Sequence, residues 1–366
     1  MVRVLLVGDS DGIAQSLRHF PKDSIIGIIC ASIRPQYFDK IEKISKFMNI
    51  PMLIQPLKRD ADLYREFIEK LDTINFDIIF INSYSMKLHA DILVKAEKGA
   101  FNVHGGLLPE YRGCSPVQWA IINKEIKSGV TLHEVTEEID CGPIIAKTEV
   151  EIGEFATWIE VTEKINLETE YILATYVPLI LTGEYTSKPQ NNRTGKTWPR
   201  RNPSDGKIPV TSPVIDIYNS SRALAYPLPG IILTSEENSD LFYDRYLTLA
   251  EIFSIKSKFM KNLISMKSPH GEIVYTSPLI FDELHKSHFL AAEHGELSFS
   301  LMQYDNTETG RAHLFDISLY NRSAKLRFEL LENGTNDSTL NLLDFLKNLL
   351  VHELSLNSLL INEITN

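Results

Sequence analysis

The chain has 366 residues, of which 43% are hydrophobic and 23% are charged. This length accommodates one large domain and a smaller one, and the composition is that of a folded globular protein rather than a disordered one. The net charge is −11, and residues 205–366 carry −8 of it, with 13 Lys and Arg against 21 Asp and Glu. A surface that grips phosphate backbones needs the opposite sign, so we expect no nucleic-acid partner.

The three cysteines, Cys30, Cys114 and Cys141, lack the even number of a disulfide framework and the C-x-x-C spacing of a zinc site. We therefore expect a reducing, cytoplasmic environment and no bound metal. No apolar run approaches the roughly 20 residues of a membrane span, so membrane insertion is not expected. The short run Val4–Val7 is typical of a first strand rather than of a signal peptide.

The first 105 residues alternate between short apolar runs and amphipathic stretches. Continuously apolar runs are typical of parallel strands, while Tyr37–Asn49 and Ala61–Leu71 have apolar residues every three or four positions, as helices do. These repeats predict an α/β fold: a Rossmann-like, mostly parallel sheet with helices on both faces. The expected strands are Val4–Val7, Ile25–Cys30, Met52–Gln55, Ile78–Asn82 and Ala100–His104.

Beyond His104 the pattern changes. Gln190–Lys207 is rich in Asn, Arg, Pro and Gly, which indicates a crossing between domains. We expect a first domain at 1–204 and a smaller β-rich C-terminal domain at 205–366. The expected helices are Pro116–Lys124, a long one that opens at the capping box Thr157–Glu160, Ile215–Ala225 and Leu340–His352; the strands are Ser128–Val135, Ile144–Ile152, Ile231–Thr234, Leu297–Gln303, His313–Leu319 and Lys325–Leu330.

Polar residues gather where the strand Ala100–His104 ends. Asn102 and His104 alternate with apolar residues, so their side chains point to the same side of the sheet. The pair Gly105-Gly106 that follows lets a ligand approach the backbone, and Asp140 lies in a predicted turn between two strands. Each residue has an ordinary alternative, as a structural histidine, a turn cap or a turn aspartate. The residues alone predict only a candidate polar site at the edge of the sheet.

Four motifs in this region have the order and spacing of a known family. Over roughly residues 1–230 the chain resembles the folate-dependent formyltransferases, which include methionyl-tRNA formyltransferase, glycinamide ribonucleotide transformylase and the sugar N-formyltransferases. The resemblance implies formyl transfer from N10-formyltetrahydrofolate, with Asn102, His104 and Asp140 as catalytic residues. The motifs are Asn102-x-His104, Leu107-Leu108-Pro109-x-Tyr111-Arg112-Gly113, Gly129-Val130-Thr131 and Asp140-x-Gly142.

The chemistry of these three side chains suits the implied reaction. N–H groups of Asn102 and His104 can stabilise the oxyanion that forms when an amine attacks the formyl carbon. A carboxylate at Asp140 would fix the His104 tautomer and stabilise its charged form. Either His104 or a water molecule that it orients takes the proton of the amine, and the sequence leaves both open.

The resemblance also implies which residues contact the folate. For Tyr84 and Met86, packing in the core is the alternative interpretation. The residues that correspond to the folate-binding loops of the family are Tyr84, Ser85, Met86, Val135, Glu137 and Glu138.

A second set of residues corresponds to contacts with the acceptor. Arg112 and Arg222 suit a pyrophosphate, because a guanidinium offers paired donors to phosphate oxygens, and a solvated or ion-paired arginine is the alternative. The implied acceptor-binding residues are Gly105, Gly106, Leu107, Arg112, Gln118, Arg222 and Tyr226.

Several segments are similar to the bacterial branch that acts on nucleotide-linked amino sugars. We therefore expect a dideoxy amino sugar, carried by dTDP, as the acceptor in O-antigen or other surface polysaccharide synthesis, and by analogy a homodimer. A methionyl-tRNA formyltransferase-like enzyme and a non-catalytic binding protein on the same fold stay open as alternatives. The identity of the sugar, the 3- or 4-position of its amine and the role of residues 231–366 stay open too. The segments are Arg34–Tyr37, Asn82–Met86, Gln118–Asn123, Arg200–Ile208, Tyr218–Ala223 and Pro227–Gly230.

Overall fold

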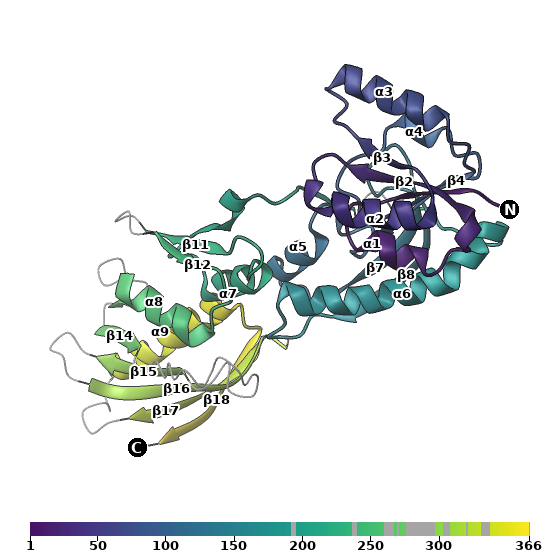
Figure 1. Ribbon diagram of the computed structural model, residues 1–366. Helices are drawn as coiled ribbons and strands as arrows, with labels where there is room; N and C mark the ends of the chain where they lie inside the picture. The colour runs from purple at the N-terminus through teal and green to yellow at the C-terminus, as the bar shows by residue number, and fades with distance from the viewer. Residues whose placement is uncertain are drawn as a thin grey trace. The chain divides into compact units, whose positions relative to one another are not determined.

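The chain forms two compact units (Figure 1). The first unit comprises Met1–Ala120, Lys127–Glu151 and Glu160–Arg200, and the second comprises Ile121–Ile126, Ile152–Ile159 and Arg201–Asn366. The computed structural model describes residues 1–191, 195–235, 240–259, 267–268, 271–275, 297–302, 308–319, 321–330 and 337–365.

A seven-stranded sheet forms the centre of the first unit, in the order β3-β2-β1-β4-β5-β7-β8. The strands β1 to β5 are parallel, and β7 and β8 continue the sheet antiparallel. The strand order reverses between β1 and β4, so a crevice is expected at the carboxyl ends of these strands. The strands are β1 Val4–Val7, β2 Ile25–Ala31, β3 Met52–Gln55, β4 Ile78–Asn82, β5 Ala100–His104, β7 Lys127–Glu134 and β8 Ile144–Glu151.

Helices cover both faces of this sheet (Figure 1). On one face, α3 (Ala61–Asp72) and α4 (Ala90–Leu93) pack against alternate residues of β1 and β4. On the other face, α1 (Gly12–Leu17) adjoins β4. The buried side-chain amide of Asn82, at the end of β4, donates to the Gly12 carbonyl at 3.2 Å. The helix α6 (Trp158–Thr182) runs beside α1. The predicted fold class is confirmed.

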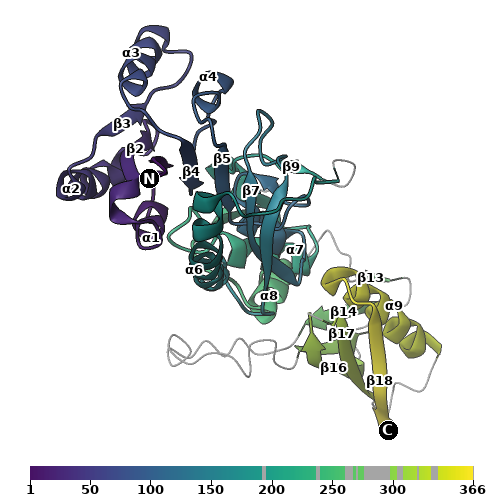
Figure 2. The same cartoon turned by 90° about the vertical axis from the view of Figure 1, so that its right-hand side faces the viewer.

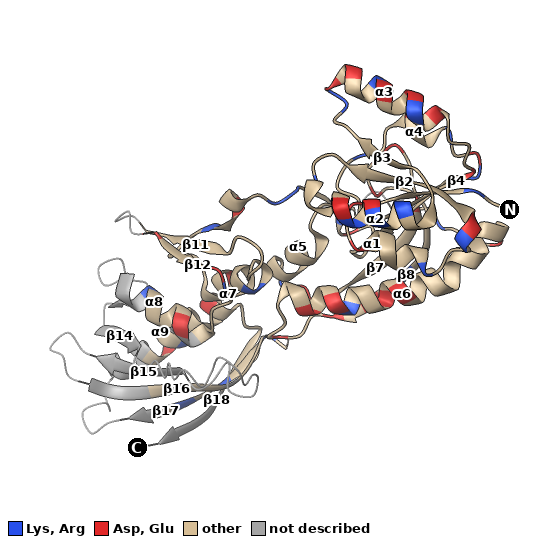
Figure 3. Cartoon of the chain, viewed as in Figure 1, with Lys and Arg blue, Asp and Glu red and all other residues tan. Residues whose placement is uncertain are grey.

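The helices have the amphipathic pattern that the sequence predicts. In α3, Tyr64, Phe67 and Leu71 are buried at helical spacing while their neighbours face solvent. The helix α2 (Phe38–Met48) likewise buries Ile41, and acidic and basic residues are mixed along both helices (Figure 3). No described helix is long and apolar enough to cross a membrane.

A six-stranded sheet is the main β-structure of the second unit (Figure 2), in the order β13-β14-β15-β16-β17-β18. It is antiparallel except for the parallel pair β17–β18. Its strands are β13 Lys267–Ser268, β14 Gly271–Tyr275, β15 Leu297–Met302, β16 Glu308–Ser318, β17 Ser323–Leu330 and β18 Ser358–Thr365; a three-stranded sheet contains β10 Lys207–Pro209, β11 Ile231–Thr234 and β12 Leu241–Tyr243.

Three helices accompany these sheets: α7 (Val214–Ala223), α8 (Leu249–Phe259) and α9 (Asp337–Leu354). Inward-facing residues of β16 and β17, among them Leu314 and Phe328, are fully buried, as are Leu346 and Leu350 of α9. The predicted β-rich C-terminal region with its amphipathic helix is therefore confirmed. The elements with no predicted counterpart include α8, the short strands β10, β12, β13 and β14, and β18, whose strand character depends on pairing with β17 across the intervening helix.

Truncation of one central ring tests how strongly the first sheet is packed. Phe80 of β4 is 0% exposed and lies edge-on to Phe20, with 4.9 Å between ring centroids. We expect Phe80→Ala to lower the free energy of unfolding by about 3–5 kcal/mol, measured by urea denaturation. Phe47→Ala, on a side chain that is 83% exposed, is the control and should change it by less than about 0.5 kcal/mol. Equal losses would contradict this packing.

Candidate active site

The candidate site begins at the carboxyl end of β5. Asn102 and His104 lie on the same face of the strand, opposite His133 and Thr131 of β7 in the antiparallel register. The Thr131 hydroxyl donates to the Gly106 carbonyl at 2.7 Å and accepts from the Leu108 N–H at 3.2 Å. These two bonds hold the loop after β5 against the sheet.

Asp140 reaches the same place from the turn between β7 and β8. Its φ of 53° is in the left-handed region, which is uncommon for a residue with a side chain. One carboxylate oxygen, Oδ2, accepts from the Gly113 N–H at 2.8 Å and lies 3.5 Å from His104 Nδ1. The other, Oδ1, lies 3.4 Å from Asn102 Nδ2. The structure thus brings the three predicted catalytic side chains together.

The Asp140 carboxylate is largely withdrawn from solvent, with its side chain 11% exposed. Burial alone would raise its pKa. The charge of the His104 imidazole, the hydrogen bond and charge of His133, and the Gly113 N–H outweigh burial and hold the pKa well below its ordinary value. Asp140 is therefore ionised at neutral pH and can hold positive charge on the neighbouring rings.

Both ring nitrogens of His104 face oxygen acceptors. Nδ1 faces Asp140, and Nε2 lies 2.6 Å from the carbonyl oxygen of Tyr111, to which it donates. An N–H of His104 can reach a ligand through Nε2 only if the ligand replaces this carbonyl. Gly106 keeps that position open, because a Cβ there would lie 3.0 Å from Nε2 and 2.6 Å from Pro116 Cβ.

A second histidine at the site is absent from the predicted set. His133 of β7 is 1% exposed; its Nδ1 donates to the carbonyl of Glu134 at 2.7 Å. Its Nε2 lies 3.1 Å from Asn102 Nδ2 and 3.4 Å from Asp140 Oδ1. Strand alternation is the signal that could have found it, since the buried apolar residues Val130 and Leu132 alternate with the polar residues Thr131 and His133.

Gln190 is a further residue that sequence reasoning missed. Its Nε2 donates to the carbonyls of Asp140 at 2.8 Å and Gly142 at 2.7 Å, and its Oε1 accepts two bonds from Arg112. The backbone of the Asp140 turn is therefore held by a buried guanidinium acting through an amide. The guanidinium of Arg112 thus donates to Gln190 within the protein. Its contact with a pyrophosphate stays a prediction.

The loop after β4 contains three of the predicted folate-binding residues. The hydroxyl of Tyr84 donates to Gln55 Oε1 at 2.8 Å. The N–H and hydroxyl of Ser85 both donate to the carboxylate of Asp9, at 2.8 and 3.1 Å. Burial raises the pKa of Asp9, which is 2% exposed and follows β1. This loop is thus fixed at the carboxyl ends of β1 and β4.

The other predicted contacts are distributed more widely. Met86 Sδ accepts from the Ser32 hydroxyl at 3.9 Å. Val135 is partly buried against the core, and its N–H donates to the Ala100 carbonyl, whereas Glu137 and Glu138 are exposed.

The acceptor-binding predictions fall on both units. Gly105, Leu107 and Gln118, the last on α5 (Pro116–Ile122), are partly exposed residues of the first unit. In the second unit, Tyr226 is 73% exposed, and the buried Arg222 donates to the carbonyls of Gly153 and Ala156. Within the described ranges, no group of three or more His, Cys, Asp or Glu residues could hold a metal ion.

Comparison with known proteins finds a family match in the N-terminal part of the chain. Residues 17–177 match the family model described as formyl transferase. This segment contains Asn102, His104 and Asp140 as well as most of the central sheet. The predicted resemblance to the formyltransferases is thus confirmed over residues 17–177.

A curated relative and two solved structures extend this likeness. Over 261 residues the chain is 34% identical to the bifunctional polymyxin resistance protein ArnA of Wigglesworthia glossinidia brevipalpis; the match covers 71% of this chain and 37% of that relative's length. A sugar N-formyltransferase from a Shewanella species has a TM-score of 0.54 at 18% identity, over 67% of this chain and 98% of its own.

The N-formyltransferase of Helicobacter canadensis, solved with folinic acid and dTDP-3-aminofucose, has a TM-score of 0.52 at 18% identity. That match covers 84% of this chain and 98% of the Helicobacter protein. At this level of identity the solved structures establish the fold.

The depressed pKa of Asp140 makes a prediction about acid stability. Its ionised form stabilises the folded protein fully above the unfolded-state value near pH 4, and this contribution is lost as the pH falls through the lower folded-state value. We expect the difference in free energy of unfolding between wild type and Asp140→Asn to shrink below about pH 4, measured by urea titration at several pH values. A difference that grows in acid would contradict this assignment.

Proposed function

We propose that the protein is an N-formyltransferase that moves the formyl group of N10-formyltetrahydrofolate to the amine of a nucleotide-linked amino sugar. One observation carries the proposal: Asn102, His104 and Asp140 converge at the carboxyl edge of the sheet, within the segment that matches the formyl transferase family. Such edges are where α/β folds bind ligands.

The proposed roles follow from the contacts of each side chain. One N–H of Asn102 engages His133, and the second makes only a 3.4 Å contact to Asp140, so it can turn to a formyl oxygen. His104 Nε2 is the second donor once the ligand replaces the Tyr111 carbonyl. Nε2 of His104 can take the proton released by the amine only when it carries none itself; when Nε2 already donates to the oxyanion, a water molecule that the ring orients takes the proton. The ionised Asp140 stabilises the protonated ring in either case.

The folate supplies the formyl carbon: the amine nitrogen bonds to it first, and its bond to N10 breaks when the resulting oxyanion intermediate collapses, with a proton passing to N10. The residues proposed to hold it are Tyr84, Ser85, Met86, Val135, Glu137 and Glu138. Ser85 suits this role, since Asp9, Arg34 and Arg200 fix its backbone and hydroxyl groups. A loop that is held before binding loses less conformational freedom when the ligand arrives.

For the acceptor we propose a dTDP-linked amino sugar and a role in O-antigen or other surface polysaccharide synthesis. The Helicobacter neighbour, solved with dTDP-3-aminofucose, supports this choice. Gly105, Gly106, Leu107, Arg112, Gln118, Arg222 and Tyr226 are the proposed acceptor contacts. A homodimer, a cytoplasmic location and the division into domains at 1–204 and 205–366 belong to the same proposal.

The methionyl-tRNA alternative is disfavoured by charge, because residues 205–366 carry −8 and would repel a polyanion. The non-catalytic alternative is disfavoured by the presence of all three catalytic side chains. A direct test offers N10-formyltetrahydrofolate with dTDP-linked 3-amino and 4-amino sugars, a UDP-linked 4-amino sugar and Met-tRNA. We expect a mass increase of one formyl group on a nucleotide sugar. Formylation of Met-tRNA alone would overturn the proposal.

Removal of either donor should slow the chemistry. We expect His104→Ala and Asn102→Ala each to reduce kcat by roughly 100-fold or more, since each removes a group that stabilises the developing charge. Steady-state turnover with the best acceptor of the panel measures this. His352→Ala, on the exposed side of α9, is the control and should keep near-normal turnover. Near-normal rates in both site variants would place the site elsewhere.

A further inference from the structure

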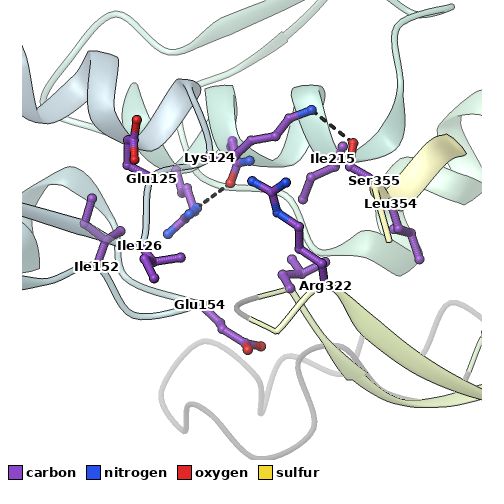
Figure 4. A pocket seen from close by; sticks show the side chains of 12 residues that line it. Lys124, Glu125, Ile126, Ile152, Glu154, Ile215, Arg322, Leu354 and Ser355 are labelled. Atoms are coloured by element: carbon purple, nitrogen blue, oxygen red, sulfur yellow. Dashed lines mark hydrogen bonds between the residues drawn. The ribbon is translucent and has the colours of Figure 1, made fainter. Parts of the chain in front are cut away.

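The second unit contains a small pocket between five segments of its own chain (Figure 4). It is lined by the loops after α5 and β8, by α7, by the turn between β16 and β17, and by the end of α9. The cavity measures about 30 Å³, which accommodates about two water molecules or one compact oxyanion. Three cationic side chains, Lys124, Arg222 and Arg322, face this space.

Arg322 is the most available of the three. Its side chain extends from the β16–β17 turn into the pocket (Figure 4), and none of the residues that the structure describes accepts a hydrogen bond from its guanidinium. A guanidinium carries five N–H donors in a planar fork that matches carboxylate and phosphate oxygens. The Arg322 side chain therefore has its full capacity to bind an anion.

A buried amide offers a second donor. Asn219 of α7 is 2% exposed, and its Oδ1 accepts from Arg222 Nε at 2.9 Å. Because Arg222 can only donate, this bond fixes the amide orientation and leaves Asn219 Nδ2 as a donor. No described residue accepts a hydrogen bond from Nδ2, and Asn219 lines the pocket, so this donor is available to a ligand there. Arg222 is itself held by the Gly153 and Ala156 carbonyls, so it anchors Asn219.

Two more donors complete the set. Lys124 Nζ lies 2.9 Å from Asp216 Oδ1 and donates to Ser355 Oγ at 3.1 Å, which leaves one N–H of the ammonium. Since the Ser355 oxygen accepts this bond, its own hydrogen can be donated to a ligand. Lys124, Arg322 and Ser355 all have left-handed φ, of 65°, 51° and 51°. Such sparsely populated backbone conformations cluster at ligand sites.

The carboxylates of the pocket do not satisfy these donors. Glu154 accepts from the Ser318 hydroxyl at 2.6 Å, and Glu125 also has a partner of its own. Asp216 neutralises Lys124 but leaves Arg322 unmatched. The pocket thus presents donors that lack acceptors, and a complementary ligand must bring several acceptor oxygens and a negative charge.

We propose that this pocket binds a phosphate-type oxyanion, held by the Arg322 guanidinium, Asn219 Nδ2, Lys124 Nζ and the Ser355 hydroxyl. The tetrahedral oxygens of phosphate can accept from all four donors at once, which a planar carboxylate with two oxygens cannot. Inorganic phosphate and the diphosphate of a nucleotide share this chemistry. Arg222, one of the proposed acceptor contacts, also lines this pocket, but none of the four donors named here belongs to the proposed folate or acceptor contacts, so the inference does not rest on the proposed formyl transfer.

The test measures binding to the full-length protein by isothermal titration calorimetry with inorganic phosphate, dTDP and thymidine. We expect binding of phosphate and none of thymidine. Since dTDP is also expected to bind at the proposed acceptor site, only the part of its binding that Arg322→Gln removes belongs to this pocket. Arg322→Gln should weaken phosphate binding roughly 10-fold or more, as loss of a charge-assisted bidentate pair does. Asn219→Asp should weaken it as well, because it keeps the acceptor for Arg222 while replacing the donor by a negative charge.

Two controls separate the pocket from other effects. Lys347→Gln removes a positive charge from the surface of α9 in the same unit and should bind phosphate as wild type does. His104→Ala should also bind normally, so that failure of the catalytic proposal and failure of this one remain distinguishable. Circular dichroism melting checks that each variant is folded.

The outcomes are decisive in both directions. Loss of dTDP binding together with phosphate binding in Arg322→Gln identifies a nucleotide diphosphate as a ligand, and loss of phosphate binding alone identifies the free ion. Absence of phosphate binding in wild type, or equal binding of phosphate by wild type and a folded Arg322→Gln, would overturn the proposal. So would thymidine binding as tight as that of dTDP.

Discussion

The candidate active site depends on one buried carboxylate. Asp140 lies in a turn whose backbone accepts a hydrogen bond from the Gln190 amide. The imidazoles of His104 and His133 and the N–H of Gly113 stabilise its ionised form. Without that charge, Asn102 and His104 would project from β5 with no common partner. The turn is narrow, since a Cβ at Gly142 would lie 1.8 Å from the Glu134 carbonyl oxygen. The backbone of the turn and the charges around it therefore both fix the position of the Asp140 carboxylate at the edge of the sheet.

The sequence predicts the centre of the first sheet accurately because β1, β4 and β5 are buried on both faces. The expected limits of β1, β3, β4 and β5 agree with the structure to the residue, since continuous apolar runs need no knowledge of neighbours. The second unit is harder to predict, as β16 begins at Glu308 rather than His313 and β18 depends on a parallel pairing formed after α9. Strands defined by distant partners leave a weak local pattern.

The active site shows the same division between local and tertiary information. Asn102 and His104 could be predicted because they share one strand, and Asp140 because its spacing matches a family motif. His133 lies on β7, seven residues before Asp140, and Gln190 follows α6 in the sequence. Both come into contact with Asp140 only when the chain folds, so no local pattern indicates them. The pocket in the second unit is a more extreme case, since its donors come from separate segments and no motif connects them.

The central claim is that Asp140 acts on the reaction through His104. A double-mutant cycle in kcat, with Asp140→Asn, His104→Ala and the double variant, tests this claim most directly. If the carboxylate acts through the imidazole, the double variant should be little slower than His104→Ala alone. Fully additive losses, with Asp140→Asn as damaging without His104 as with it, would contradict the account.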